Sequence, residues 1–450
     1  MKRFLYDIFR QFSAFERSRQ RRLTPNGLVV LICLICSGVL SVDTNQSMAA
    51  QIFTFLLSLF IIAIVSSRLF RFRFHAVRML PKFATVGVTI KYRLVIHNRT
   101  NKTQKGLKLL ENFADPRPNF LEFLTTPEPN ENIHNVVDRY LGYYRWLWLV
   151  KRKQGATAKS VDLPPLLPES KTEAIGEITP LYRGVIRLVG LTVFRPDPFN
   201  LFNASVTISL PQSLLVLPKL YQIPPIQLPG FRRYQSGGVA LASSVGDAEE
   251  FRSLREYRPG DSLRKIHWKS WAKVGKPIVK EEQDEFFVRH ALILDTFQSM
   301  KYSEVLEEAI AIAASFACEV QTQESLLDLM FVGHEAYCFT FGRSLSHTDK
   351  MLEILASVVA CQDKSFSALT PVLLERVSLL SGCICIFISW DDERQQLVNY
   401  LKSIGLNTLI LIISETETKL PNSEINSIRD NLTQCQVLRL GKIQEDLMQL

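Results

Sequence analysis

The sequence predicts an α/β domain at the C-terminus, preceded by a small β-sandwich and by an N-terminal hairpin of two apolar helices. Three patterns in the 450-residue chain lead to this architecture. Two long apolar runs lie near the N-terminus, short runs of alternating polarity follow, and apolar strands then alternate with helical segments. Because each pattern has its own period and length, the chain divides into parts that fold differently.

The N-terminal pattern predicts membrane anchorage. Each apolar run has the length needed to span a thin bilayer core, and the polar break Val42–Gln46 separates the two. A cleaved signal peptide fits poorly, because the second apolar run follows at once. We therefore expect a basic tail over residues 1–25, a transmembrane hairpin over 26–66 with spans 26–42 and 48–65, a β-sandwich over 79–217, a connector over 218–289 and an α/β domain over 290–450.

The charge distribution predicts the topology. Residues 1–22 hold seven bases and two acids, and residues 68–110 hold eleven bases and no acid. Since these bases flank the apolar runs on their outer sides, the positive-inside rule places both termini and all soluble domains in the cytoplasm. The net charge of +9 is explained in this way, and we expect no nucleic-acid partner.

Residues 1–22 also carry five aromatic side chains, and two interpretations of this tail remain open. Either the tail lies on the inner leaflet, where its basic side chains meet anionic lipid, or it is disordered.

The eight cysteines do not indicate a metal or redox site. Cys33 and Cys36 have CxxC spacing inside an apolar run and are interpreted as packing residues, and the other cysteines are typical of reduced thiols in the cytosol.

Alternating polarity begins at Val86 and predicts the strands of the sandwich. Further strands are expected over Gly106–Phe113, Gly184–Phe194, Val206–Leu210 and Leu214–Leu217. The aromatic run Tyr140–Trp148 fits strand packing better than docking on the bilayer, because aromatic residues favour sheets.

After His290–Asp295, strands and helices alternate, which indicates an open, mainly parallel sheet with its ligand site beyond the carboxyl ends of the strands.

Between these parts lies a basic, aromatic stretch, Phe251–Glu285. Nine bases and two acids occur from Phe251 to Lys280, with Trp268 and Trp271 among them. Pro259-Gly260-Asp261 predicts a turn that folds the stretch back on itself. Asp261 precedes Arg264 by three residues, so we expect these two side chains to pair beside a buried Trp268, and the loss of Asp261 to destabilise the region.

This stretch resembles the signature of a bacterial family, domain of unknown function family 58. The matching residues are Arg255, Tyr257, Pro259, Gly260, Asp261, Arg264, Ile266, His267 and Trp268. The segment RPDPFNLF, Arg195–Phe202, also resembles the family, although Asn200 stands where members usually carry Gly. Asn tolerates the left-handed conformation that such a turn needs.

The resemblance implies a protein of the bacterial inner membrane with a C-terminal von Willebrand factor A-like domain, which is Rossmann-like in its α/β fold. It also implies a gene neighbourhood with a MoxR-type AAA+ ATPase. No activity is established for the family.

The expected strand ends resemble the metal-ion-dependent adhesion site of von Willebrand A domains, whose oxygen ligands suit Mg²⁺. Asp295, Ser299, Thr370 and Asp391 correspond to ligands of that site. Phe297 and Trp390 stand where two further ligands are expected, so we predict a degenerate site that binds Mg²⁺ weakly or not at all. Asp295 and Thr370 act as helix caps in the alternative interpretation.

Three roles remain open for the signature stretch: a structural connector with buried tryptophans, a surface for a protein partner, or a site for phosphate, anionic lipid or nucleic acid. No Ser or Cys nucleophile is paired with His267 in a known motif, and the sequence has no phosphate-binding P-loop. We therefore expect a non-enzymatic, membrane-anchored adaptor without a cofactor, whose partner is the MoxR-type ATPase. A metal-dependent, membrane-associated hydrolase is the alternative.

Overall fold

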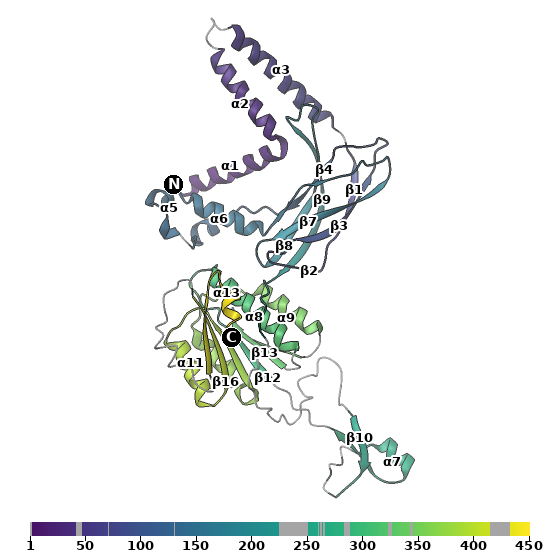
Figure 1. The fold of residues 1–450 in the computed structure, drawn as a ribbon, viewed down its shortest axis with the longest axis vertical. Helices are drawn as coiled ribbons and strands as arrows, with labels where there is room; N and C mark the ends of the chain where they lie inside the picture. Colours follow the sequence, from purple (N-terminus) through teal and green to yellow (C-terminus); the bar gives the residue numbers. More distant parts are fainter. Residues whose placement is uncertain are drawn as a thin grey trace. The chain divides into compact units, whose positions relative to one another are not determined.

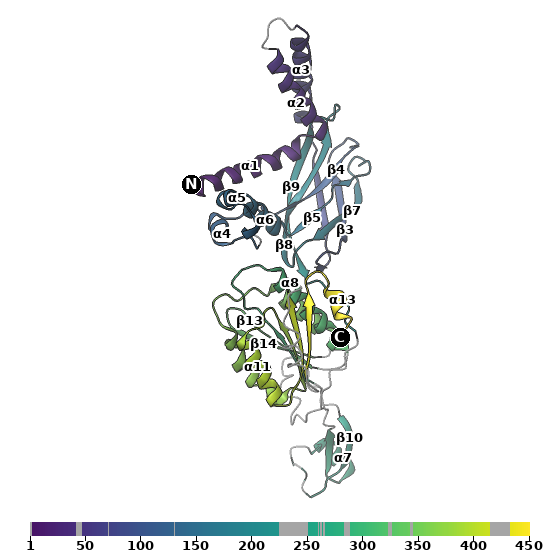
Figure 2. The ribbon, with the colours of Figure 1, turned by 60° about the vertical axis from the view of Figure 1, so that its left-hand side comes forward.

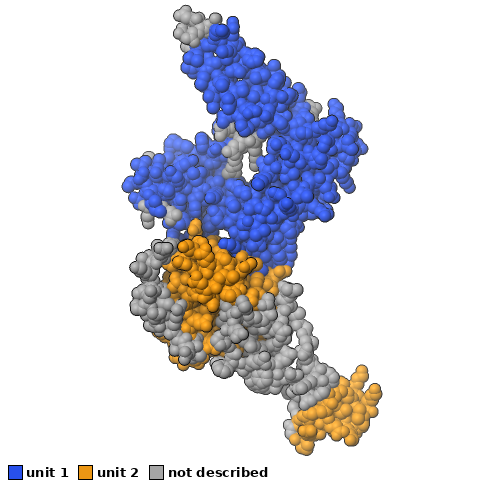
Figure 3. Space-filling model, viewed as in Figure 1, with its two compact units in different colours: residues 1–219, 300–303, 352–358 blue, residues 220–299, 304–351, 359–450 orange. Residues whose placement is uncertain are grey.

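A computed structural model describes residues 2–41, 47–70, 72–129, 131–224, 251–259, 261, 263, 266–282, 289–322, 326–342, 345–414 and 433–450. The chain divides into two compact units (Figure 3). The first contains residues 1–219, 300–303 and 352–358, and the second contains 220–299, 304–351 and 359–450. Each unit is described by itself.

The first unit begins with three helices, α1 (Lys2–Arg22), α2 (Pro25–Leu40) and α3 (Ser47–Leu69). Thr24 separates α1 from α2 as an N-cap whose side chain accepts a hydrogen bond from the Gly27 N–H. Pro25 follows at the first helical position, where its missing N–H costs nothing. The interpretation of this segment as a disordered tail is wrong, because residues 2–22 form α1.

Among the described residues, one helix, Met48–Leu69, is long and apolar enough to cross a membrane. The other apolar helix, α2, is shorter and packs along α3, with Gly38 against the Phe53 ring. The predicted break Val42–Gln46 lies outside the described residues.

Two sheets follow in the first unit. One has the order β1 (Phe74–Met79), β3 (Ile90–Asn98), β7 (Lys171–Pro180), β5 (Ala156–Ala158), and the other β2 (Phe83–Thr85), β9 (Asn203–Leu217), β8 (Gly184–Pro196), β4 (Lys108–Phe113), β6 (Val161–Asp162). Inward side chains of both sheets, such as Leu94 and Leu191, share one apolar core. The alternation along β3 causes this arrangement, since every second side chain is buried.

Between β4 and β5 the chain forms α4 (Phe120–Thr125), η1 (Glu131–Ile133), α5 (Val136–Leu141) and α6 (Tyr143–Gln154). The prediction of strand packing for Tyr140–Trp148 is therefore wrong. Trp146 and Leu149 are three residues apart and bury on one helical face, where they form a small core with Tyr6 and Phe123. This tertiary contact with α1 outweighs the sheet preference of the aromatic side chains.

The second unit holds a six-stranded sheet with the order β14 (Ala336–Phe341), β13 (Leu326–Val332), β12 (Arg289–Leu294), β15 (Gly382–Phe387), β16 (Asn407–Ser414), β17 (Thr433–Arg439). All neighbours pair in parallel except β13 and β14. The strand order reverses between β12 and β15, which creates a topological switch point at their carboxyl ends.

Helices pack on this sheet (Figures 1 and 2). After β12, the helical elements among the described residues are α8 (Glu304–Thr322), α9 (Leu345–Ser357), η3 (Phe366–Leu369), α10 (Thr370–Leu374), η4 (Val377–Leu379), α11 (Asp392–Ser403) and α13 (Ile443–Leu447). One apolar core joins side chains of η3, α10 and α11 to alternate residues of the central strands, such as Ile293 and Cys385. The central strands are buried throughout, as expected of parallel strands that helices cover.

The signature stretch forms a separate small element, which we call the signature module. It consists of β10 (Phe251–Glu256), α7 (Trp268–Val274) and β11 (Ile278–Glu282), with β10 and β11 paired antiparallel. Gly275, with φ of +75°, ends α7 in the left-handed conformation that glycine adopts without strain. Gly260 and Arg264 of the signature lie outside the described residues.

Candidate functional site

The carboxyl end of β12 presents Asp295, which is fully buried. The Arg394 guanidinium donates to both of its oxygens, from Nε to Oδ2 at 2.7 Å and from Nη2 to Oδ1 at 3.0 Å. The N–H groups of Phe297 and Ile388 donate to the same carboxylate, each at 3.1 Å. Burial raises the pKa of Asp295, and Arg394 with the two N–H groups acts in the opposite direction.

The first turn of α11 positions Arg394. Asp391 is the N-cap of this helix and accepts from the Arg394 N–H at 3.1 Å, so Arg394 sits within the first turn. Its guanidinium also pairs with the Asp391 carboxylate and lies 4.7 Å from the centre of the Phe366 ring. Asp391 and the Phe366 ring thus orient the guanidinium toward Asp295. In a metal site a cation would supply the positive charge that Arg394 supplies here.

The structure places the four predicted ligands differently. Asp295 and Asp391 share Arg394, as described above, and Asp391 is half-exposed at the surface. Ser299 is exposed, and its carbonyl accepts from the Gln362 side chain at 2.6 Å. Thr370 is the first residue of α10. Within the described ranges, no group of three or more His, Cys, Asp or Glu side chains is placed to hold a metal ion.

The helix-cap interpretation needs correction. The Asp295 carboxylate satisfies backbone N–H groups, but these belong to Phe297 and Ile388 in the loops after β12 and β15. The N-cap of α10 is Leu369, and no side chain caps that helix. Asp391 is the residue that caps a helix at this edge, and Thr24 shows the same role in the first unit.

A second buried pair lies toward the opposite end of the same strands. Arg289, the first residue of β12, donates to Asp328 of β13 through Nε at 2.8 Å and Nη2 at 2.9 Å. The Thr340 hydroxyl of β14 donates to the same carboxylate at 2.7 Å. The sequence interpretation missed this cluster, although a single charged residue in each of the apolar strings RHALIL and LLDLMFV is a usable signal.

The signature module is held by an ion pair between Arg255 and Asp261. Nη1 and Nη2 of Arg255 donate to the two carboxylate oxygens, each at 2.7 Å, and the Arg258 N–H adds a third bond at 2.8 Å. Hydrogen bonding from Arg255 and Arg258 lowers the pKa of Asp261 to about 2. Asp261 thus pairs with Arg255 at the end of β10, and Arg264, the partner expected from the sequence, lies outside the described residues.

The two tryptophans of the module are not buried as a connector would require. Trp268 stacks on Trp271 with ring centroids 5.1 Å apart and remains 64% exposed. His267, at the start of α7, has its Nδ1 2.6 Å from the Ser270 hydroxyl. Three-residue spacing at the start of a short helix produces this contact, which the sequence interpretation did not foresee. The exposed Trp268, stacked on a half-buried Trp271, favours a contact surface over an internal joint.

The RPDPFNLF segment fastens α2 to the sheet that contains β8 and β9. The Asp197 carboxylate accepts from the N–H groups of Phe199, Leu201 and Phe202. Asn200 has a φ of +55°, so the prediction that Asn adopts the left-handed conformation here is confirmed. The Leu201 carbonyl then accepts from the Thr24 N–H at 3.1 Å, at the base of α2.

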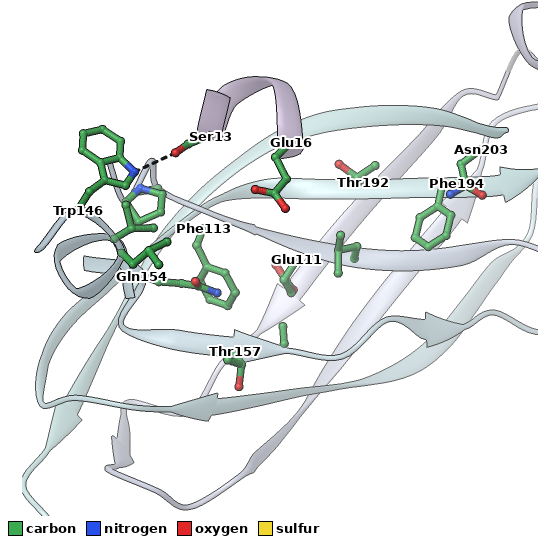
Figure 4. Close-up of a pocket in the computed structure, with 16 residues that line it drawn as sticks. Ser13, Glu16, Glu111, Phe113, Trp146, Gln154, Thr157, Thr192, Phe194 and Asn203 are labelled. Carbon is green, nitrogen blue, oxygen red and sulfur yellow. Dashed lines mark hydrogen bonds between the residues drawn. The ribbon is translucent and has the colours of Figure 1, made fainter. Parts of the chain in front are cut away.

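The first unit also contains a cleft of about 640 Å³ between α1, α6 and the sheet (Figure 4). Glu111 lies on its wall, and its carboxylate is bound by Arg78 and by the Tyr92 hydroxyl. Burial raises the pKa values of both Tyr92 and Glu111. Trp146 donates through its indole N–H to the Ser13 hydroxyl at 2.9 Å on the same wall. The polar side chains on this wall bind one another, so we interpret their role as stabilising the fold.

Comparisons with known proteins identify the region that includes the signature. Residues 253–440 match the family described as "Protein of unknown function DUF58". The "Uncharacterized protein YeaD" of Bacillus subtilis (strain 168) is 26% identical over 206 residues, which are 45% of this chain and 50% of that protein. The chain thus spans about half the length of this curated relative.

A solved structure of a GH20 exo-β-N-acetylglucosaminidase from Vibrio harveyi matches with 9% identity and a TM-score of 0.12. This match covers 76% of this chain and 46% of that one, and a score this low carries no structural argument. The family match coincides with the signature module, the six-stranded sheet and the Asp295–Arg394 pair. Residues 253–440, which are less than half of the chain, are thus similar to the DUF58 family.

Proposed function

We propose that this protein is a membrane-anchored, non-enzymatic adaptor or assembly factor. Its α/β domain, which we assign to the von Willebrand factor A-like class, presents the carboxyl edge of the sheet to a cytoplasmic partner. The candidate partner is a MoxR-type AAA+ ATPase, as the family resemblance implies. The order of the six strands and the switch point between β12 and β15 support this fold assignment.

The observation that carries the proposal is the Asp295–Arg394 pair. A hydrolase of the metal-dependent class needs a carboxylate at this edge that is open to a cation or to a water molecule. Here the buried carboxylate is occupied on both oxygens by a guanidinium and by backbone N–H groups. The charged residues that remain exposed beside it, Asp392 and Glu393, suit recognition of a protein surface more than catalysis.

Membrane anchorage is proposed from α3, with α2 as a second, shorter segment that completes a hairpin in the inner membrane. In this topology both termini and all soluble parts are cytoplasmic. Reporter fusions after Val65, at Leu450 and at Asn45 test it: the first two should report cytoplasm and the third the opposite side. A translocated C-terminus would exclude a cytosolic ATPase as the partner.

The adaptor role is tested by affinity capture of the full chain from detergent-solubilised membranes. Asp392→Arg reverses a charge at the carboxyl edge, and Asp162→Arg reverses an exposed charge in the first unit as a matched control. We expect the ATPase to be retained by the wild type and the control, and at least about tenfold less by Asp392→Arg. Retention that is equal in all three proteins would place the partner elsewhere, and capture of no ATPase would refute this partner.

A specific observation favours the signature module as a second contact. Trp268 is exposed and stacked, and Lys269 and Lys273 beside it are exposed as well. Such a surface suits a protein hot spot, and an anionic lipid or nucleic acid is the alternative ligand. Trp268→Ala should weaken ATPase capture while leaving the sheet intact. Loss of binding to anionic vesicles or to single-stranded nucleic acid without loss of ATPase capture would favour the alternative.

A further inference from the structure

An apolar surface on α1 has no partner among the described residues. Phe4, Ile8, Phe12 and Phe15 recur at spacings of four, four and three residues, which places them on one side of the helix. Three of these side chains are more than half exposed: Phe4 at 68%, Phe12 at 58% and Phe15 at 67%. Large apolar side chains that gather on one exposed face mark a surface that another apolar phase covers.

The opposite side of α1 packs against the rest of the first unit, so the orientation of the exposed side within this unit is defined. Tyr6 packs edge-to-face on Trp146 with ring centroids 5.6 Å apart, and its hydroxyl donates to the Pro118 carbonyl at 3.1 Å. Ser13 accepts from the Trp146 indole, as Figure 4 shows. These contacts hold one side of α1 against α4 and α6. The side that carries Phe4 and Phe12 is not needed for this packing.

The helical insertion extends the apolar surface. Ile133, Val136 and Val137 are each more than two-thirds exposed, and Tyr140 is half-exposed. They belong to η1 and α5, and both ribbon views draw α5 beside the N-terminal end of α1 (Figures 1 and 2). We call α1, η1 and α5 together the platform.

The direct connection of α1 to the apolar helices α2 and α3 indicates which kind of surface contacts the platform. Leu23 and Thr24 join α1 directly to α2, and both views show α1 running across, not along, the direction of α2 and α3. If α3 crosses a bilayer, a helix with this orientation lies in the plane of the membrane surface. The base of α2 is fastened by Leu201, so this geometry is set by hydrogen bonds within the unit.

The charge of α1 indicates the kind of membrane surface. Lys2, Arg3, Arg10 and Arg22 are all exposed, and the helix holds seven bases against two acids. Helices that carry aromatic side chains on one side and bases on another bind at the interface of anionic bilayers. We propose that the platform rests on the anionic cytoplasmic leaflet, with Phe4, Ile8, Phe12 and Phe15 inserted below the headgroups.

This inference rests on the proposed membrane anchorage, and the experiment separates the two. The full chain is reconstituted into phosphatidylcholine–phosphatidylglycerol vesicles with and without brominated acyl chains, which quench tryptophan by contact. Phe12→Trp reports on the platform, and Phe55→Trp, at an exposed position of α3, reports on the anchor. Ala14→Trp is the matched control, since Ala14 is exposed but lies about 160° around the helix from Phe12.

We expect brominated lipid to quench the added tryptophan of Phe12→Trp and Phe55→Trp at least twofold more than that of Ala14→Trp. Quenching in Phe55→Trp alone would overturn the platform and leave the anchor in place. An unquenched Phe55→Trp would overturn the anchor and the platform with it.

A separate experiment tests the contribution of the basic side chains of α1 to membrane binding. Replacing Lys2, Arg3 and Arg10 by Gln in the Phe12→Trp background should reduce quenching in vesicles that contain phosphatidylglycerol. Quenching in pure phosphatidylcholine should be lower at the outset and unaffected by these replacements. If the replacements change nothing in either lipid, recognition of anionic headgroups by α1 is refuted.

Discussion

Arg394 holds Asp295 through two hydrogen bonds, with Nε 2.7 Å from Oδ2 and Nη2 3.0 Å from Oδ1, across 99 positions of the chain. Both side chains are almost completely buried. The pair lies at the switch point of the sheet, which is where open α/β sheets place their ligands. This buried ion pair is the basis for our proposal that the domain acts as a binding module.

Loss of Arg394 should be costly. Arg394→Met leaves the Asp295 carboxylate buried without its counter-charge, and we expect a loss of about 3–5 kcal/mol in the unfolding free energy of the α/β domain. Gln396→Met, at an exposed position of the same helix, should change it by less than about 0.5 kcal/mol. Urea-dependent pulse proteolysis of the detergent-solubilised chain, with fragments quantified by mass spectrometry, measures both.

A double variant sharpens this prediction. Asp295→Asn combined with Arg394→Met removes both charges, so its cost should be smaller than the sum of the two single costs. Additive costs would mean that the two side chains do not interact in solution.

Magnesium should bind weakly or not at all at the carboxyl edge. The guanidinium of Arg394 occupies both oxygens of Asp295, and the side chains of Phe297 and Trp390 carry no oxygen atom. Isothermal titration of the full chain with Mg²⁺ measures this directly. Micromolar binding that Asp295→Asn abolishes would contradict the prediction.

The signature module should depend on Asp261. Asp261→Asn removes the charge that Arg255 and the Arg258 N–H bind, so the amides of β10 and β11 should exchange faster with deuterium at neutral pH. Lys273→Ala, at an exposed position of α7, should leave their exchange unchanged. Equal exchange in wild type and Asp261→Asn would show that the turn holds without this ion pair.

The same ion pair predicts a pH dependence. The pKa of Asp261 falls from 3.8 to about 2 in the folded state. A lowered carboxyl pKa stabilises the fold above the unfolded value, and this contribution disappears as the pH falls from about 4 to about 2. Amide exchange of β10, corrected for intrinsic rates, should therefore rise across that window in the wild type more than in Asp261→Asn.

His290 predicts a second pH dependence, in the α/β domain. Burial in β12 lowers the pKa of His290 from 6.5 to about 4, so the unfolded chain binds a proton there before the folded chain does. The domain should thus lose up to about 3 kcal/mol of stability as the pH falls from 6.5 to 4, and nothing further below that. Urea-dependent pulse proteolysis at several pH values follows this loss. In His290→Leu the slope should be flatter, and an identical slope would assign the pH dependence to other groups.

Local sequence patterns predicted those features of the structure that depend mainly on residues close together in the chain. The left-handed turn at Asn200 is confirmed, and one apolar helix has the length to cross a membrane, because a turn and a span are properties of short segments. The similarity of residues 253–440 to the DUF58 family was likewise recognisable from a contiguous signature. The von Willebrand factor A-like assignment, the domain boundaries and the partner stay predictions.

The site needed the tertiary structure. Asp295 and Asp391 were recognisable from the strand and helix that they border, but the role of Arg394 depends on two segments that meet only after the sheet has formed. The same holds for Arg289 with Asp328, whose strands are neighbours in space. Even within the signature, the sequence did not reveal that Arg255, at the end of β10, pairs with Asp261.

The aromatic run Tyr140–Trp148 shows the physical reason most clearly. Its composition favours a strand, yet it forms helices because Trp146 and Leu149 bury against Tyr6 and Phe123. Local preferences amount to a few tenths of a kcal/mol per residue, whereas burying one large side chain contributes about 1.5–3 kcal/mol. Periodicity could therefore indicate the apolar and alternating segments, although the strands expected over Val206–Leu210 and Leu214–Leu217 form the single strand β9. Long-range burial decided which partners the side chains of these segments meet.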